Sequence, residues 1–193
     1  MILPDWKIEQ YVEEGKIEIE PFSHSQVQPH SYDLRLGRGL MSQEQPISNY
    51  SFEGLPEFNI IRRGKHGEQV EPSYYEFELP RGGIHSFCLG TTLERIKLPD
   101  NIVAQVDGKS TLGRLGLSVH QTAGWIDAGF NGNITLELNP VSDIPVMLTP
   151  YMLIAQIIFV ETEPARRPYG HPSRNSHYQN QKGVTQPRGL EDL

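Results

Sequence analysis

Hydrophobic residues near the N-terminus follow a helical spacing. Ile8, Tyr11 and Val12 recur at the i, i+3, i+4 positions of one helical face. A Pro-Asp pair precedes this stripe and Gly15 follows it, as is typical of the start and the end of a helix. We therefore predict one short N-terminal helix.

Beyond this helix, short runs of apolar and β-branched residues predict strands. Gly, Pro, Asn and Asp separate the runs at short intervals, which favours a sandwich or barrel over alternating strands and helices. No long helical pattern is available to cover a parallel sheet. The candidate strands are residues 16–20, 32–36, 58–63, 74–79, 85–98, 102–107, 133–138 and 152–161. The predicted fold class is all-β with one short helix, in a single domain over residues 1–164.

The end of the chain differs from this domain in composition and charge. Residues 165–193 are rich in Pro, Gly, Ser, Asn and Gln, which favours a flexible tail that becomes ordered only against a ligand or another surface. The tail carries a charge of +3, whereas the whole chain carries −7. A solvated surface would explain this asymmetry, and so would attraction of a compact polyanion such as a nucleotide triphosphate.

Overall composition restricts the classes of function. The net charge of −7 argues against a general nucleic-acid binder. No apolar run is long enough to predict a membrane span, and no signal segment is apparent, so we expect a cytoplasmic protein. The only cysteine, Cys88, is expected in the core. A single cysteine excludes a disulfide framework and the cysteine-rich zinc site of the zinc-dependent nucleobase deaminases.

The densest group of polar and glycine residues spans residues 107–140. It begins with GKST, but Val103 stands where a P-loop needs its first glycine, and the following residues show no helical stripe. We expect instead a glycine turn that presents backbone N–H groups, Lys109 and two hydroxyls, a combination suited to phosphate. A β-turn with ordinary polar residues is the alternative.

Two carboxylates occupy the second half of the same stretch. Asp127 falls in a predicted turn, GWIDAGFNG, and Glu137 falls inside the predicted strand ITLEL. Strand alternation places Glu137 on the face opposite its two leucine neighbours. It is either a solvent-facing strand residue or a carboxylate lining a cleft opposite Ser110 and Arg114.

The sequence resembles the dCTP deaminase branch of the dUTPase superfamily. The resemblance lies in GKSTLGRLGL and GWIDAGFNGNITLEL, with weaker similarity over residues 27–37, 89–102 and 168–183. It implies a dUTPase-like distorted jelly roll, or β-clip, in a homotrimer with active sites at the subunit interfaces. It also implies that the tail, residues 165–193, closes over bound nucleotide. The metal would be Mg²⁺ carried on the triphosphate, with no zinc, and dTTP becomes a candidate effector.

The resemblance also assigns roles to residues. Glu137 matches the family's catalytic carboxylate, Ser110 and Arg114 match its partners, and Asp127 matches the residue that holds the deoxyribose 3′-hydroxyl. The matching nucleotide-binding positions are Lys109, Ser110, Thr111, Leu112, Gly113, Arg114, Asp127, Thr135, Leu136, Glu137, Gln156, Tyr169 and Gln181. One position departs from the family: a lysine is common before the tail tyrosine, whereas this chain has His177, whose neutral form would bind phosphate more weakly.

The implied reaction is zinc-independent deamination of dCTP coupled to pyrophosphate release, giving dUMP and ammonia. One carboxylate can take a proton from the attacking water and pass it to the leaving amine. Gly124-Trp125 resembles the dUMP-forming group, whereas dUTP-releasing members more often have a His-Arg pair. Asp127 would then help to orient a second water. A deaminase that releases dUTP is the main alternative, followed by a plain dUTPase and by a nucleotide-binding regulator without catalysis. A further alternative is that Trp125 is only a core aromatic residue.

Overall fold

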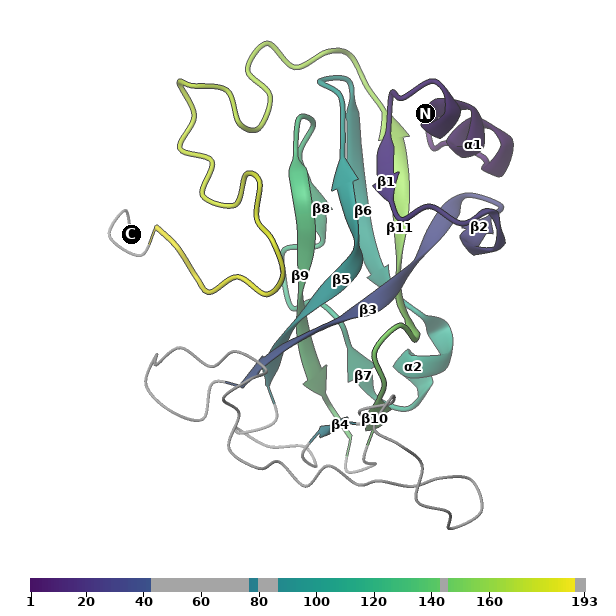
Figure 1. The fold of residues 1–193 in the computed structure, drawn as a ribbon, viewed down its shortest axis with the longest axis vertical. Coiled ribbons are helices and arrows are strands. Elements are labelled where there is room, and N and C mark those ends of the chain that lie inside the picture. Colours follow the sequence, from purple (N-terminus) through teal and green to yellow (C-terminus); the bar gives the residue numbers. More distant parts are fainter. Residues whose placement is uncertain (43–76, 80–86, 143–145, 190–193) are drawn as a thin grey trace.

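One antiparallel sheet organises the protein (Figure 1). The computed structural model describes residues 1–42, 77–79, 87–142 and 146–189. Within these ranges the strands are β1 (Glu18–Glu20), β2 (Val27–Gln28), β3 (Ser31–Ser42), β4 (Phe77–Leu79), β5 (Cys88–Lys97), β6 (Ile102–Gly108), β7 (Leu117–Ser118), β8 (Trp125–Ile126), β9 (Asn131–Pro140), β10 (Val146–Leu148) and β11 (Leu153–Glu161). The main sheet follows the order β7-β9-β5-β3-β11-β6-β8, with β1 beside β5 and β2 beside β3, and β10 pairs with β4.

The long strands form where the sequence alternates. Along β9 every second residue is buried, including Ile134, Leu136 and Leu138, so one face of the strand packs into the core. Register shifts between β3 and β5 and between β5 and β9 mark irregularities at which such strands bend. The predicted all-β class is confirmed. The predicted strand 58–63 lies outside the described residues, as do residues 74–76 of the strand predicted at 74–79 and residues 85–86 of the strand predicted at 85–98.

The predicted N-terminal helix is confirmed as α1 (Asp5–Glu13), which buries Ile8 and Tyr11. Two polar side-chain groups of the helix contact the end of β11. The Tyr11 hydroxyl donates to Glu161 Oε1 at 2.6 Å, and Lys7 Nζ lies 3.1 Å from Glu161 Oε2. These contacts hold the helix against the sheet. Neither α1 nor any other helix in the described part of the chain is long and apolar enough to span a membrane.

The expectation of a glycine turn without a helix after GKST was wrong. Residues Ser110–Arg114 form a short helix, α2, in which Gly113 N–H donates to the Lys109 carbonyl at 2.9 Å. Leu112 is buried under this turn, and Gly116, at φ 85°, closes the segment. A single helical turn is too short to produce a hydrophobic periodicity, so the sequence pattern did not indicate it.

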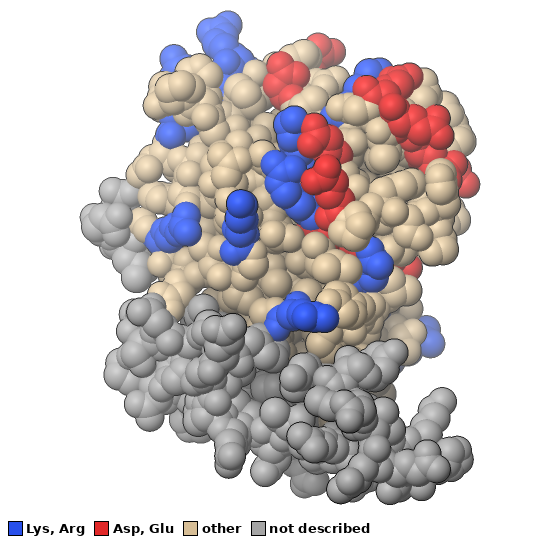
Figure 2. Space-filling model, in the orientation of Figure 1, with Lys and Arg blue, Asp and Glu red and all other residues tan. Residues whose placement is uncertain are grey.

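The tail crosses the surface beside β9 (yellow in Figure 1). Residues 165–189 contain no helix and no named strand. They are joined to β9 by hydrogen bonds from Asn133 N–H to the Gln181 carbonyl at 3.1 Å and from Asn180 N–H to the Asn131 carbonyl at 2.7 Å. On the face drawn in Figure 2, acidic side chains gather on the side of α1 and at the centre, where basic side chains lie directly beside them, and further basic side chains lie on the side of the tail. Closure of the tail over a nucleotide stays a prediction.

Candidate active site

Glu137 lies on the half-exposed face of β9, between the buried residues Leu136 and Leu138. The segment that follows β7 runs beside it, because Glu137 N–H donates to the Val119 carbonyl at 2.9 Å. The backbone N–H of Gln121 donates to Glu137 Oε2 at 2.7 Å. The described residues give Glu137 Oε1 no hydrogen bond. The carboxylate is therefore fixed through one oxygen, and the other can interact with a ligand or a water molecule.

Leu112 packs into the core and is the only buried residue of α2. The other residues of this helix are exposed: Ser110, Thr111, Gly113 and Arg114. Helix α2 follows β6 directly, so the end of that strand fixes where the helix begins.

Lys109, the residue before α2, is only partly exposed, because its side chain is paired with a buried carboxylate. Its Nζ lies 2.6 Å from the Oδ1 atom of Asp33, a side chain that is only 3% exposed. Gln156, on β11, donates to the Gly108 carbonyl at 3.4 Å. In this structure the Lys109 ammonium is thus occupied by a buried carboxylate.

Asp127 and the tail residues Tyr169 and Gln181 lie around the start of β9. Asp127 begins a turn in which its carbonyl accepts from Phe130 N–H at 3.2 Å, and its side chain is exposed. Tyr169 N–H donates to the Ala128 carbonyl in this turn at 2.8 Å. Burial raises the pKa of the Tyr169 phenol, while the Tyr178 N–H that donates to it acts in the opposite direction. The structure therefore brings Tyr169 beside the turn that carries Asp127.

Four polar atoms in this region are buried without a partner among the described residues: His120 Nδ1, Asn131 Oδ1, Thr135 Oγ1 and Gln181 Oε1, of which the last two belong to predicted nucleotide-binding residues. Gln181 is nevertheless fixed in place, because its Nε2 donates to the Asn133 carbonyl at 2.6 Å. A buried polar atom without a hydrogen bond is costly and calls for an explanation. A bound ligand that hydrogen-bonds to Thr135 and Gln181 would provide one for these two.

Gly124 lies where there is little room for a side chain. A Cβ atom there would lie 2.9 Å from the Val106 carbonyl oxygen and 3.1 Å from Cε1 of the His120 ring. The Gly124 carbonyl also accepts from Val106 N–H at 2.7 Å, which fixes the position of its backbone. Trp125, the next residue, is 56% exposed and is not a core residue of this chain.

The candidate residues thus form two groups. The α2 group contains Lys109 and residues 110–114, and the β9 group contains Glu137, Thr135, Asp127, Gly124, Trp125, Tyr169 and Gln181. In the part of the chain that the structure describes, no hydrogen bond or ion pair joins one group to the other. Nor do three or more His, Cys, Asp or Glu side chains gather there as a metal site.

Sequence reasoning missed three residues that shape this site. Gln121 acts through its backbone N–H, so its side-chain type gives no signal. His120 packs against Gly124, and Asp33 pairs with Lys109. Asp33 does fall within the resembling segment 27–37, which could have drawn attention to it.

Comparisons with known proteins agree with the resemblance in the sequence. The family model described as dCTP deaminase-like matches residues 2–162. A protein of Dictyoglomus thermophilum named dCTP deaminase, dUMP-forming, is 44% identical over 197 residues, which cover 97% of this chain and 94% of that protein. A Halobacterium salinarum protein of the same name is 44% identical and covers 95% of this chain and 92% of its own length.

A solved structure supports the fold. The 2′-deoxycytidine 5′-triphosphate deaminase of Agrobacterium tumefaciens aligns with a TM-score of 0.59 at 24% identity. The alignment covers 82% of this chain but only 47% of the Agrobacterium chain. At this identity the likeness concerns the fold.

Proposed function

This chain belongs to the dCTP deaminase-like family, and we propose that it converts dCTP into dUMP, ammonia and pyrophosphate. The observation that carries the proposal is the Glu137 carboxylate, held at one oxygen by Gln121 N–H on a strand whose neighbouring residues are buried. The relatives named dUMP-forming span nearly the whole chain, which favours this reaction over release of dUTP, a plain dUTPase or a regulator without catalysis.

In the proposed deamination, Glu137 acts as both base and acid. Its Oε1 takes a proton from a water that adds to C4 of the cytosine ring, and the carboxyl group then delivers that proton to the amine that leaves as ammonia. The Ser110 hydroxyl would hold the water, and the Arg114 guanidinium would stabilise charge that develops near the base. Thr135 Oγ1 and Gln181 Oε1 offer unused hydrogen-bonding atoms for the nucleotide.

The second step would remove pyrophosphate in the same pocket. A second water attacks the α-phosphorus, the bond to the β,γ-diphosphate breaks, and dUMP is left. We propose that Asp127 orients this water, since the turn that carries it adjoins Tyr169 and the start of β9. Mg²⁺ would arrive on the triphosphate, as it commonly does at nucleotide sites. The location proposed for the reaction is the cytoplasm.

We further propose that the working unit is a homotrimer in which α2 of one subunit faces the β9 group of another. Exposed apolar side chains near both groups support contact with a second copy. Leu115 is 41% exposed, Val141 70% and Trp125 56%. Leu115 and Val141 lie together, because Val141 N–H donates to the carbonyl of Gly116 at 2.7 Å. Such residues are typical of an interface core when they gather in one place.

Mixing two inactive variants tests both the residue roles and the shared site. Glu137→Gln and Ser110→Ala should each lower ammonia release from dCTP by about 10²-fold or more, the usual scale for a positioned acid–base group. If the site combines two chains, a re-equilibrated equal mixture should regain up to about a quarter of the wild-type activity, because some interfaces then hold both native residues. A site built within one chain would give no recovery. Near-normal turnover by Glu137→Gln alone would refute its role.

A further inference from the structure

Asp33 is a buried carboxylate on β3 whose partner is Lys109, the residue directly before α2. Its Oδ1 atom lies 2.6 Å from Lys109 Nζ, and its Oδ2 accepts from the Gln28 amide at 3.3 Å. The Asp33 side chain is 3% exposed and that of Lys109 is 25% exposed. An ionised carboxylate at such a site needs a charged partner, because the loss of its hydration costs several kcal/mol. If Lys109 moved away, Asp33 would remain as a buried charge without a charged partner, at a cost of several kcal/mol.

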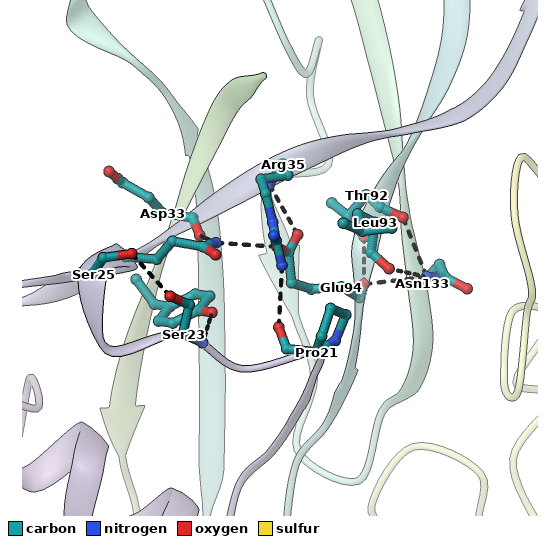
Figure 3. Close-up of polar contacts among 11 residues, drawn as sticks. Pro21, Ser23, Ser25, Asp33, Arg35, Thr92, Leu93, Glu94 and Asn133 are labelled. Atoms are coloured by element: carbon teal, nitrogen blue, oxygen red, sulfur yellow. Dashed lines mark hydrogen bonds and ion pairs between the residues drawn. The ribbon is translucent and has the colours of Figure 1, made fainter. Parts of the chain in front are cut away.

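The burial of Asp33 follows from the way β3 is covered on both faces. Tyr32 and Leu34 are fully buried on its core face. Asp33 and Arg35 alternate with them and point to the other face. That face lies under residues 24–28, from which Gln26 donates to the Asp33 carbonyl at 2.6 Å. In Figure 3, Asp33 and Arg35 leave the same strand, and the Arg35 side chain turns toward Glu94.

A row of polar contacts runs across the sheet from Asp33 on β3, through β11, to the residues before α2. Asp33 is paired with Gln156 on β11, and Gln156 is paired with Asp107 on β6. The Gln156 amide accepts from the Ser31 hydroxyl and donates to the Gly108 carbonyl, both at 3.4 Å. Contacts from β3 and β11 thus end on the two residues directly before Ser110, residues 108 and 109.

We propose that Asp33 is a positioning residue for the active site. By holding the Lys109 ammonium, it fixes the N-terminal end of α2, which carries Ser110 and Arg114. The Lys109 ammonium is paired with Asp33 and does not bind the substrate's phosphates. The inference rests on the proposed function, since it assigns the position of groups that act in that reaction.

Three variants separate this role from phosphate binding. Asp33→Asn removes the charge while preserving the shape of the side chain, Lys109→Met removes the ammonium but keeps the stem, and Lys109→Arg preserves the charge. The measurements are kcat and KM for dCTP, taken well below the melting temperature of each variant. Lys97→Met is the matched control, because Lys97 also lies 2.6 Å from its partner, Glu18, but this pair is on the surface and on other strands.

A misplaced α2 should lower catalysis more than binding. We expect Asp33→Asn and Lys109→Met each to lower kcat by about 10- to 100-fold, the effect of roughly an ångström of displacement, with KM changed less than about threefold. The double variant should be no slower than Lys109→Met, because both changes break one contact. Lys109→Arg should retain most of the rate, and Lys97→Met should behave as wild type.

Other outcomes would overturn the proposal. If Lys109 binds phosphate, Lys109→Met will raise KM, while Asp33→Asn will leave KM unchanged or lower it by freeing the lysine. Normal kcat in Asp33→Asn would also refute the positioning role. If Asp33→Asn does not fold, the contrast between Lys109→Met and Lys109→Arg still decides between the two roles. Wild-type protein without deaminase activity would contradict the proposed function itself, whatever the variants do.

Discussion

Replacing Arg35 by methionine should remove a large part of the protein's stability. Arg35 on β3 and Glu94 on β5 form a buried ion pair (Figure 3). Arg35 Nε donates to Glu94 Oε1 at 2.6 Å and its backbone N–H donates to Oε2 at 2.8 Å. The Gln26 amide donates to the same carboxylate at 3.0 Å. The Glu94 side chain has no exposed surface, so its charge depends on these three donors.

The magnitude follows from what the substitution leaves behind. Removing one partner of a buried pair typically costs about 3–5 kcal/mol, because the other charge remains buried. Two donors to Glu94, Arg35 N–H and the Gln26 amide, survive in Arg35→Met, which places the expected loss near the lower end, about 3 kcal/mol. For a chain of this size, such a loss lowers the melting temperature by about 6–12 °C.

Urea unfolding, monitored by the circular dichroism of the β-sheet at one fixed protein concentration, measures this loss. The fixed concentration matters because assembly would couple stability to it. Lys97→Met, which breaks an exposed ion pair, should cost no more than about 1 kcal/mol. The double variant Arg35→Met/Glu94→Met should be more stable than Arg35→Met, since no buried charge is left over. A loss below about 1 kcal/mol in Arg35→Met, the size expected of an exposed pair, would show that Glu94 does not depend on Arg35.

Three further predictions concern the thiol, the tail and the glycine beside His120. Burial raises the pKa of the Cys88 thiol to about 12, so a thiol reagent at pH 8 should label it only in urea, and rapid labelling of the native protein would contradict this. The free energy of unfolding should also fall as pH rises above about 8.5, because the thiol then ionises in the unfolded chain but not in the folded one. A chain ending at Pro164 should keep its β-sheet circular dichroism but lose most dCTP turnover, because Tyr169 and Gln181 are removed; full activity would argue against a role for the tail. Gly124→Ala places a Cβ against the Val106 carbonyl and the His120 ring, so it should slow pyrophosphate release relative to ammonia release, and an unchanged ratio would show that this packing does not affect the product.

The sequence predicted the elements whose signals are local. β9 alternates strictly in burial, as do residues 102–107 of β6, and α1 has its apolar stripe and a closing glycine. The two-residue strands β7 and β8 exist only through pairing with β9 and β6, so no local pattern indicates them. Helix α2 is a single turn and was missed for a similar reason.

The site was predictable only as far as its residues form contiguous motifs. Glu137, Ser110 and Arg114 stand in such motifs, whereas Asp33 acquires its importance from burial under residues 24–28, far from α2 in sequence. Alternation in β3 indicates a strand but cannot tell that both of its faces are covered. The Gln121 N–H that holds Glu137 is a backbone group, which any residue type would supply.

A time course of products from dCTP shows whether one protein couples deamination to pyrophosphate release. Purified wild-type protein is incubated with dCTP and Mg²⁺, and ammonia, dUTP, dUMP and pyrophosphate are separated at intervals that include the first turnovers. If deamination and pyrophosphate release are coupled, ammonia, pyrophosphate and dUMP should rise together in equal amounts, with little free dUTP at any time. Early dUTP that matches ammonia, without pyrophosphate, would contradict the coupled reaction, and the absence of ammonia would contradict deamination altogether.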